Sequence, residues 1–108
     1  MKGLFVFAVT TLVLACSATQ YTQTGEIRSP REAECTFETF TIPPPRAFVE
    51  LGIVEFYTPG GGSAGWADSV ADARSRASEY VCKAGGDAIV LSAHSGSFTS
   101  ATVIAYKN

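Results

Sequence analysis

The sequence predicts a two-layer α+β domain, in which a sheet of about four strands carries one helix on one face, in the order β-β-α-β-β. Four segments have strand composition, and the segment between the second and third of them repeats apolar residues at spacings of three and four. The 108 residues leave room for one small domain. A single helix laid across a single sheet is the simplest way for these elements to bury their apolar sides.

The predicted strands are 35–42, 48–57, 88–93 and 98–107. Pro43 to Pro45 end the first strand, because proline has no amide hydrogen to donate to a neighbouring strand. The second strand has apolar side chains on both faces, with Val49, Leu51 and Ile53 on one of them. Strands buried on both faces lie in the interior of a sheet. We therefore expect 48–57 to have a neighbour on each side.

The predicted helix covers 66–84. Its apolar residues form one stripe, made of Trp66, Val70, Ala73, Ala77, Val81 and Ala84. Gly85 and Gly86 end the helix, because glycine readily adopts the left-handed conformation of a helix C-cap. The last two strands are joined by His94–Ser97 as a hairpin. The small side chains of Ala101 and Ala105 would let the helix approach the final strand closely.

Residues 1–15 are predicted to be an export signal peptide. Lys2 supplies the positive start, and the uncharged apolar segment 3–15 is shorter than the about 20 residues that a membrane-spanning helix needs. The segment ends in Val13-Leu14-Ala15-Cys16, which resembles the lipobox of bacterial lipoproteins. The resemblance implies cleavage before Cys16 and attachment of a lipid anchor, including palmitate, to that residue. The alternative is an ordinary secreted protein whose Cys16 pairs with another cysteine.

Ser17 stands where an aspartate is associated with retention in the inner membrane, so the resemblance favours the outer membrane, facing the periplasm or the cell surface. The segment from Ser17 to Ala33 is polar and has neither helical nor strand periodicity, and we expect a flexible tether. The chain is therefore predicted to divide into a signal peptide (1–15), a lipidated tether (16–33) and a globular domain (34–108).

Cys35 and Cys82 remain as an even pair in an oxidising compartment, and a disulfide between them is one expectation. On an ideal helix Cys82 lies off the apolar stripe. Either the first strand reaches around the end of the helix, or Cys82 is a free thiol. No metal site is expected, because the sequence has neither a CxxC motif nor a His-Cys cluster. No cofactor is implied.

One catalytic pattern is present. Gly61–Gly65 has the GxSxG form of serine hydrolases, and Asp87 and His94 follow in the matching order. Such enzymes brace this motif with a much larger parallel sheet, and Pro59-Gly60 would leave the turn loose. We therefore predict a protein that is not an enzyme, with hydrolysis through Ser63 as a remote alternative. The net charge of −2 and the scattered Lys and Arg residues argue against nucleic-acid binding.

Leu51-Gly52-Ile53-Val54 in the second strand and the segment 85–90 (GGDAIV) resemble small bacterial envelope domains of the RcsF-like and YbjQ-like type. The resemblance implies this fold and a lipid-anchored location in the outer membrane. We expect a non-enzymatic envelope lipoprotein that acts as a structural, interaction or sensor module by contact with another envelope protein. The apolar, proline-rich segment 40–45 is a candidate docking edge for that partner. The alternative is a small-ligand or metal-binding periplasmic module.

Overall fold

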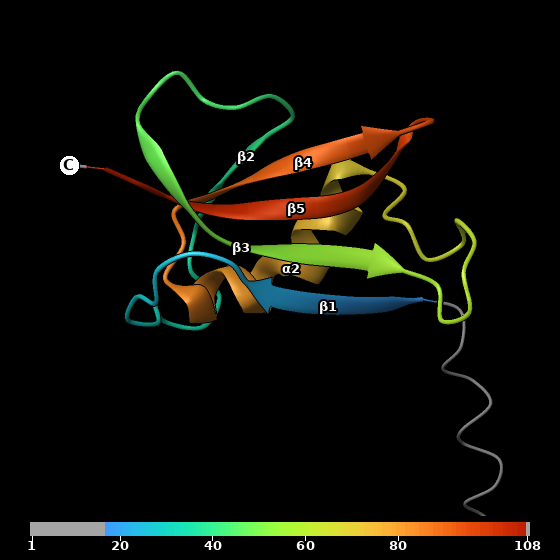
Figure 1. Ribbon diagram of the computed structural model, residues 1–108, viewed down its shortest axis with the longest axis horizontal. Coiled ribbons are helices and arrows are strands. Elements are labelled where there is room, and N and C mark those ends of the chain that lie inside the picture. The colour runs from blue at the N-terminus through green and yellow to red at the C-terminus, as the bar shows by residue number, and fades with distance from the viewer. Residues whose placement is uncertain (1–16, 108) are drawn as a thin grey trace, which may run out of the picture.

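The computed structural model describes residues 17–107, which form five strands and one helix (Figure 1). The elements are β1 (Ala18–Gln23), β2 (Glu38–Phe40), β3 (Phe48–Tyr57), α2 (Val70–Ala84), β4 (Ala88–His94) and β5 (Ser97–Tyr106). The α+β class is as predicted. The predicted signal peptide and the predicted lipidation site, Cys16, lie outside the described residues.

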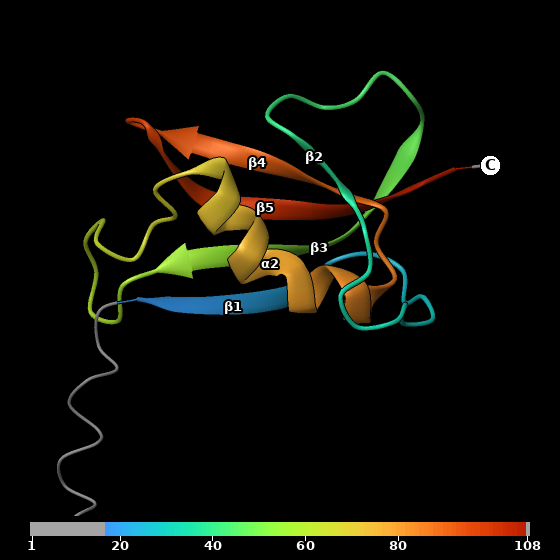
Figure 2. The ribbon, with the colours of Figure 1, turned by 180° about the vertical axis from the view of Figure 1, so that it is seen from behind.

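The five strands form one mixed sheet in the order β1-β3-β5-β4-β2. Strand β2 runs parallel to β4, and the other neighbouring pairs are antiparallel. The helix α2 crosses one face of the sheet (Figure 2). The prediction of about four strands in the order β-β-α-β-β is wrong in this detail, because an additional strand precedes the predicted ones and lies at the sheet edge.

That additional strand, β1, corrects the prediction of a flexible tether over 16–33. All six residues of β1 pair with β3. Tyr21 turns toward α2, where its ring stacks on that of Tyr80 with the centroids 6.0 Å apart. Thr19 faces the same side and accepts a hydrogen bond from Arg76 at 3.3 Å. The segment is polar because an antiparallel strand can have one face exposed to water.

Strand β3 has the predicted bounds and the predicted interior position, between β1 and β5. A bulge between Glu50 and Gly52 shifts its register against β5. Side chains alternate between the two faces of a strand. The extra residue therefore reverses which side chains of the second half of β3 point toward each face. Val49 and Val54 therefore both pack toward α2, and the prediction that Val49 shares a face with Ile53 is wrong.

The helix begins at Val70 rather than at the predicted Trp66. The Ser69 side chain caps it by accepting a hydrogen bond from the amide three residues later, at 3.0 Å. Ala67 exchanges two backbone hydrogen bonds with Phe98 of β5, at 3.0 and 2.8 Å. Ala67 therefore forms an isolated bridge to β5, and the chain turns into the helix after it, so that residues 66–69 do not form the first helical turn.

The helix ends as predicted, because Gly85 adopts a left-handed conformation with φ of 77° and donates its amide to the carbonyl of Cys82. From the predicted stripe, Ala73, Ala77 and Val81 are fully buried, whereas Val70 is 41% exposed. The core between α2 and the sheet is completed mainly by Leu51, Val54, Phe56, Ile89, Leu91, Ala101, Val103 and Ala105.

The remaining elements differ from prediction mainly in length. Strand β2 is confined to three residues, because residues 35–37 run beside α2 before the chain joins the sheet. Strands β4 and β5 form the predicted hairpin, closed by Ser95 and Gly96 with φ of 54° and 85°. Two successive residues with positive φ match the type I′ turn that suits the twist of a two-residue hairpin.

Candidate functional site

The two cysteines predicted as a disulfide pair are bonded to each other. The bridge joins the segment before β2 to the last turn of α2, with the Cα atoms of Cys35 and Cys82 5.8 Å apart. Both cysteine side chains are buried. The sequence left two alternatives. The structure agrees with the first, in which the chain before β2 reaches around the end of the helix, and Cys82 is therefore not a free thiol.

Two arginines hold the segment 31–37 along the flank of α2. The amide of Arg31 donates to the carbonyl of Cys82 at 2.7 Å, and its guanidinium donates to the carbonyl of Gly86 at 2.8 Å. Arg74 donates to the carbonyl of Phe37 at 3.1 Å and lies over the Phe37 ring, 4.4 Å from its centroid. The segment is therefore a fixed wall beside the helix.

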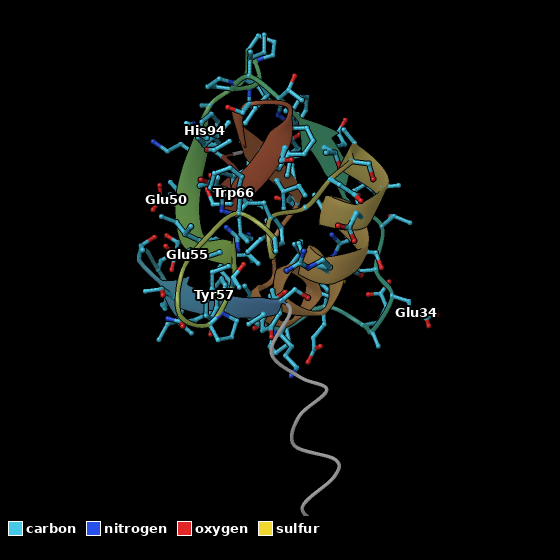
Figure 3. The ribbon with its side chains drawn as sticks, turned by 90° about the vertical axis from the view of Figure 1, so that its right-hand side faces the viewer. Glu34, Glu50, Glu55, Tyr57, Trp66 and His94 are labelled. Atoms are coloured by element: carbon cyan, nitrogen blue, oxygen red, sulfur yellow. A yellow bond between two sulfur atoms is a disulfide. The ribbon has the colours of Figure 1, made fainter. Side chains whose placement is uncertain are left out.

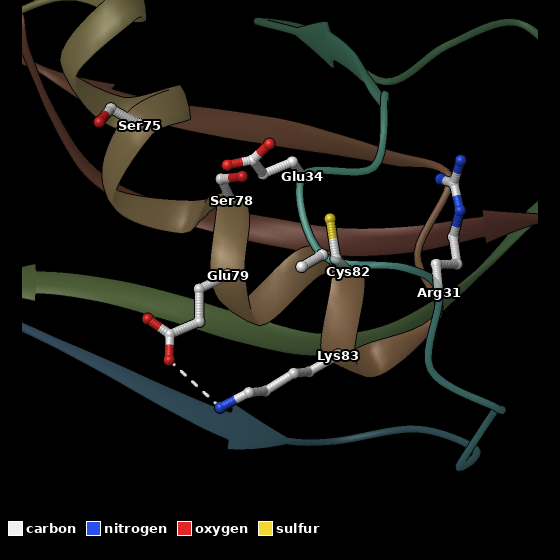
Figure 4. Close-up of a pocket in the computed structure, with 8 residues that line it drawn as sticks. Arg31, Glu34, Ser75, Ser78, Glu79, Cys82 and Lys83 are labelled. Carbon is white, nitrogen blue, oxygen red and sulfur yellow. Dashed lines mark hydrogen bonds and ion pairs between the residues drawn. The ribbon is translucent and has the colours of Figure 1, made fainter.

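A hollow of about 400 Å³ lies between this wall and α2 (Figure 4). It is lined by Arg31, Ala33, Glu34, Ser75, Ser78, Glu79, Cys82 and Lys83. Polar side chains converge here, as a small-ligand module would require. The cations are already engaged, however, because Lys83 pairs with Glu79 at 3.2 Å and Arg31 bonds to the backbone. An anionic ligand would have to compete with both contacts.

The residues of the hydrolase alternative are not brought together. Ser63 lies in the exposed loop between β3 and α2. Asp87 precedes β4, where its carboxylate accepts the amide of Tyr106 at 2.8 Å, and His94 ends the same strand. A strand rises about 3.3 Å per residue, so the seven steps from Asp87 to His94 separate them by about 23 Å. They cannot act on one serine hydroxyl in this structure.

Within residues 17–107, no three His, Cys, Asp or Glu side chains gather in a way that could hold a metal ion. No helix in the same range is long and apolar enough to cross a membrane.

The predicted docking edge, 40–45, forms a loop that leaves β2. Ile42 is 73% exposed, while Pro44 in the middle of the proline run is buried. The loop is held near its far end by Arg46, whose guanidinium lies 3.6 Å from the centroid of the Tyr106 ring. An exposed isoleucine is thus presented by a segment that three prolines stiffen.

Tyr106 also contacts β2, because its hydroxyl donates to the carboxylate of Glu38. Burial, and after it the hydrogen bond to Glu38 and that residue's negative charge, raises the pKa of Tyr106 to about 12, which the nearby Arg46 only partly offsets. The phenol is therefore a proton donor over the whole physiological range, and it connects the end of β5 to the edge strand.

Aromatic side chains gather at the end of the sheet where β1 begins (Figure 3). The rings of Trp66 and His94 are perpendicular, with centroids 5.1 Å apart, and Tyr57 is 39% exposed. We call Tyr57, the loop 58–65, Trp66 and His94 the aromatic end of the domain. A hollow of about 430 Å³ beside it is lined by Gln20, Glu55, Phe56, Tyr57, Trp66 and Thr99.

The loop of the aromatic end folds back on β3. The amide of Gly65 donates to the Thr58 hydroxyl at 2.6 Å, and the amide of Gly61 donates to the Thr58 carbonyl at 2.8 Å. The tip, 60–62, consists of glycines with positive φ and open space around each of them. No residue of 57–67 is charged. The loop is therefore an uncharged protrusion between two aromatic residues.

The sequence pattern does not reveal this surface, because it places Trp66 on the apolar stripe of a helix over 66–84. The uncharged segment flanked by Tyr57 and Trp66 was a usable signal. The GxSxG pattern of the loop concerns its glycines and Ser63, and says nothing of the aromatic residues on either side.

Comparison of the chain with protein-family models, with curated proteins and with solved structures found no match.

Proposed function

We propose that this chain is a lipid-anchored protein of the bacterial outer membrane that works without catalysis, by contact with another envelope protein. The anchor is the lipid on Cys16, the cysteine that ends the lipobox-like segment Val13–Cys16. Several acyl chains, at about 0.8 kcal/mol for each buried methylene, would hold the domain firmly at the bilayer.

The pairing of the other two cysteines is the observation that carries this proposal. The sequence contains three cysteines, and Cys35 and Cys82 are bonded to each other. The alternative for Cys16, a disulfide with another cysteine of the same chain, therefore has no partner left. A disulfide also belongs to an oxidising compartment, which supports export.

Metabolic labelling with palmitate tests the anchor. Label should enter the wild-type protein and be absent from Cys16→Ser, and only the wild type should fractionate with membranes. Cys35→Ala/Cys82→Ala is the matched control, because it removes the other cysteines and should keep the label. An unlabelled, soluble wild-type protein would contradict the proposal.

The contact surface that we assign to the partner is the proline-rich loop 40–45. A photo-crosslinking amino acid in place of Ile42 should give a defined adduct in cells. Ile27 is a matched control, because it is also an exposed isoleucine, at 87%, in a different loop. Equal crosslinking from both positions, or from neither, would argue against a partner at this loop.

The second candidate, a small-ligand module, is favoured only by the polar hollow beside α2. Lys83→Ala tests it, because this change breaks the pair with Glu79 and frees one side of the hollow. If the protein binds an anion there, its affinity for that anion should change in this variant, while palmitate labelling should not.

A further inference from the structure

The start of β1 lies very close to the proposed anchor. Ser17 is the one residue between Cys16 and Ala18, where β1 begins. Two residue steps span at most about 7 Å, even when fully extended. A lipid on Cys16 therefore brings the first residue of the sheet to the level of the headgroups, and a long tether does not separate the two.

The pairing of β1 determines which part of the domain lies there. Ala18 is opposite Tyr57, the last residue of β3, and the loop 58–65 follows directly. The hairpin end at His94 belongs to the same end of the sheet, because His94 packs on Trp66. Figure 3 looks at this end and shows Tyr57, Trp66 and His94 within it.

We infer that the aromatic end rests on the lipid bilayer, with Trp66 and Tyr57 at the level of the headgroups and acyl-chain boundary. This inference rests on the lipid anchor proposed above. Tryptophan and tyrosine favour that boundary, because their rings are apolar while the N–H or O–H group still reaches water. The glycine tip at 60–62 adds no bulk or charge that would hold the surface away.

Charge does not drive this contact, because Arg76, the cation at the start of β1, is already bonded to the carbonyl of Ala18 at 3.0 Å and paired with Asp72 at 3.7 Å. Among the described residues that line the hollow beside Trp66, Glu55 is the charged one, and it would repel an anionic headgroup. The uncharged segment 57–67 offers no lysine or arginine to an acidic lipid either. Contact should therefore form equally well on neutral phosphatidylcholine vesicles and on vesicles that contain phosphatidylglycerol, and salt should not release it.

The single tryptophan of the chain makes this testable, because all indole emission comes from Trp66. The lipidated protein is reconstituted, at constant pH, into vesicles in which part of the phospholipid carries bromine near the top of its acyl chains. The Trp66 emission should fall as the brominated fraction of the vesicles rises. Vesicles of the same lipid without bromine should show no such loss of emission. Quenching that requires phosphatidylglycerol, or that salt abolishes, would overturn the inference.

A matched probe at the other end of the domain is the control. The variant Trp66→Phe/Ile27→Trp moves the only indole to an exposed site beyond the far end of β1, a strand about 17 Å long. Its emission should not respond to brominated lipid. If this probe is quenched as strongly as Trp66, or if Trp66 is not quenched, the orientation is wrong.

Lengthening the connection between Cys16 and β1 tests whether its shortness is what brings the aromatic end to the bilayer. About twelve Gly and Ser residues inserted after Ser17 give a flexible span of about 20 Å. Quenching of Trp66 should then fall toward the level of the Ile27→Trp probe, and unchanged quenching would overturn the inference.

Palmitate labelling of each protein separates the two proposals. Label without quenching contradicts the orientation alone, whereas an unlabelled wild type contradicts the lipid anchor and the orientation with it.

Discussion

Tyr106 shows how one side chain connects three parts of the fold. It ends β5, it donates to Glu38 of β2, and Arg46 of the proline-rich loop lies on its ring. A charged acceptor strengthens the hydrogen bond, and the arginine stacks on the ring face that the bond leaves open. The loop that presents Ile42 is thus fastened at its far end to the interior of the sheet.

The raised pKa of Tyr106 makes this connection sensitive to alkali. Its pKa is 10.0 in the unfolded chain and about 12 in the folded protein. Below pH 10 both states hold the proton, but between pH 10 and 12 the unfolded chain loses it first. The free energy of unfolding should therefore fall as the pH rises through this interval.

Glu38→Gln tests the assignment, because it removes the negative charge and leaves a hydrogen-bond acceptor. The pKa of Tyr106 should fall toward 10 in this variant, as followed by phenolate absorbance, although burial should keep part of the shift. Denaturant unfolding should also depend less on pH in the alkaline range. An unchanged titration would mean that Glu38 does not contribute to the shift.

At the scale of elements, β1 decides whether the N-terminal segment is a tether or part of the sheet. Tyr21→Ala removes the stack on Tyr80 and part of the cover over Gly52, and should cost about 1 to 2 kcal/mol in urea unfolding. Thr22→Ala is the control, because the adjacent exposed position should change stability by less than about 0.5 kcal/mol. A flexible tether would make both substitutions neutral.

The disulfide is the second feature that acts at the scale of elements, because it joins the segment before β2 to α2. It closes a loop with 47 residues of sequence separation, for which the chain-entropy model gives about 4 kcal/mol. Cys35→Ala/Cys82→Ala should therefore lose a large part of the stability of a domain this small. Cys16→Ser changes a cysteine outside this bridge and should unfold at the wild-type urea concentration. Equal losses in the two proteins would contradict the assigned role of the bridge.

Elements with a strong apolar pattern were predictable, and those defined by tertiary contacts were not. The interior strand β3, the hairpin and the Gly85 stop follow from alternation and turn chemistry. The pattern of β1 does not predict a strand, because the residues on its helix side are Thr19, Tyr21 and Gln23, which leave little hydrophobic signal. The spacing places Trp66 on the helix, but Ala67 pairs with Phe98 of β5, a partner that sequence spacing cannot reveal.

For the whole molecule, the sheet order predicts a gradient of stability. Strands β3 and β5 each have a hydrogen-bonded neighbour on both sides, whereas β1 and β2 each have one neighbour within the described residues. Local opening begins where fewest contacts must break. Amides of β3 and β5 should therefore exchange their hydrogens most slowly, and those of β2 should exchange fastest among the strands.

Reduction of the disulfide should change this gradient in one region only. The bridge and Arg74 tie the segment 31–37 to α2, and β2 follows that segment directly. Without the bridge, exchange should accelerate in β2 and in the last turn of α2, while β1 keeps its rate because its contacts are with β3, Tyr80 and Arg76. Hydrogen exchange followed by mass spectrometry, with and without reductant, measures both regions together. Equal acceleration in β1 and β2 would show that the bridge stabilises the whole domain as one cooperative unit, and that the two sheet edges are not independent.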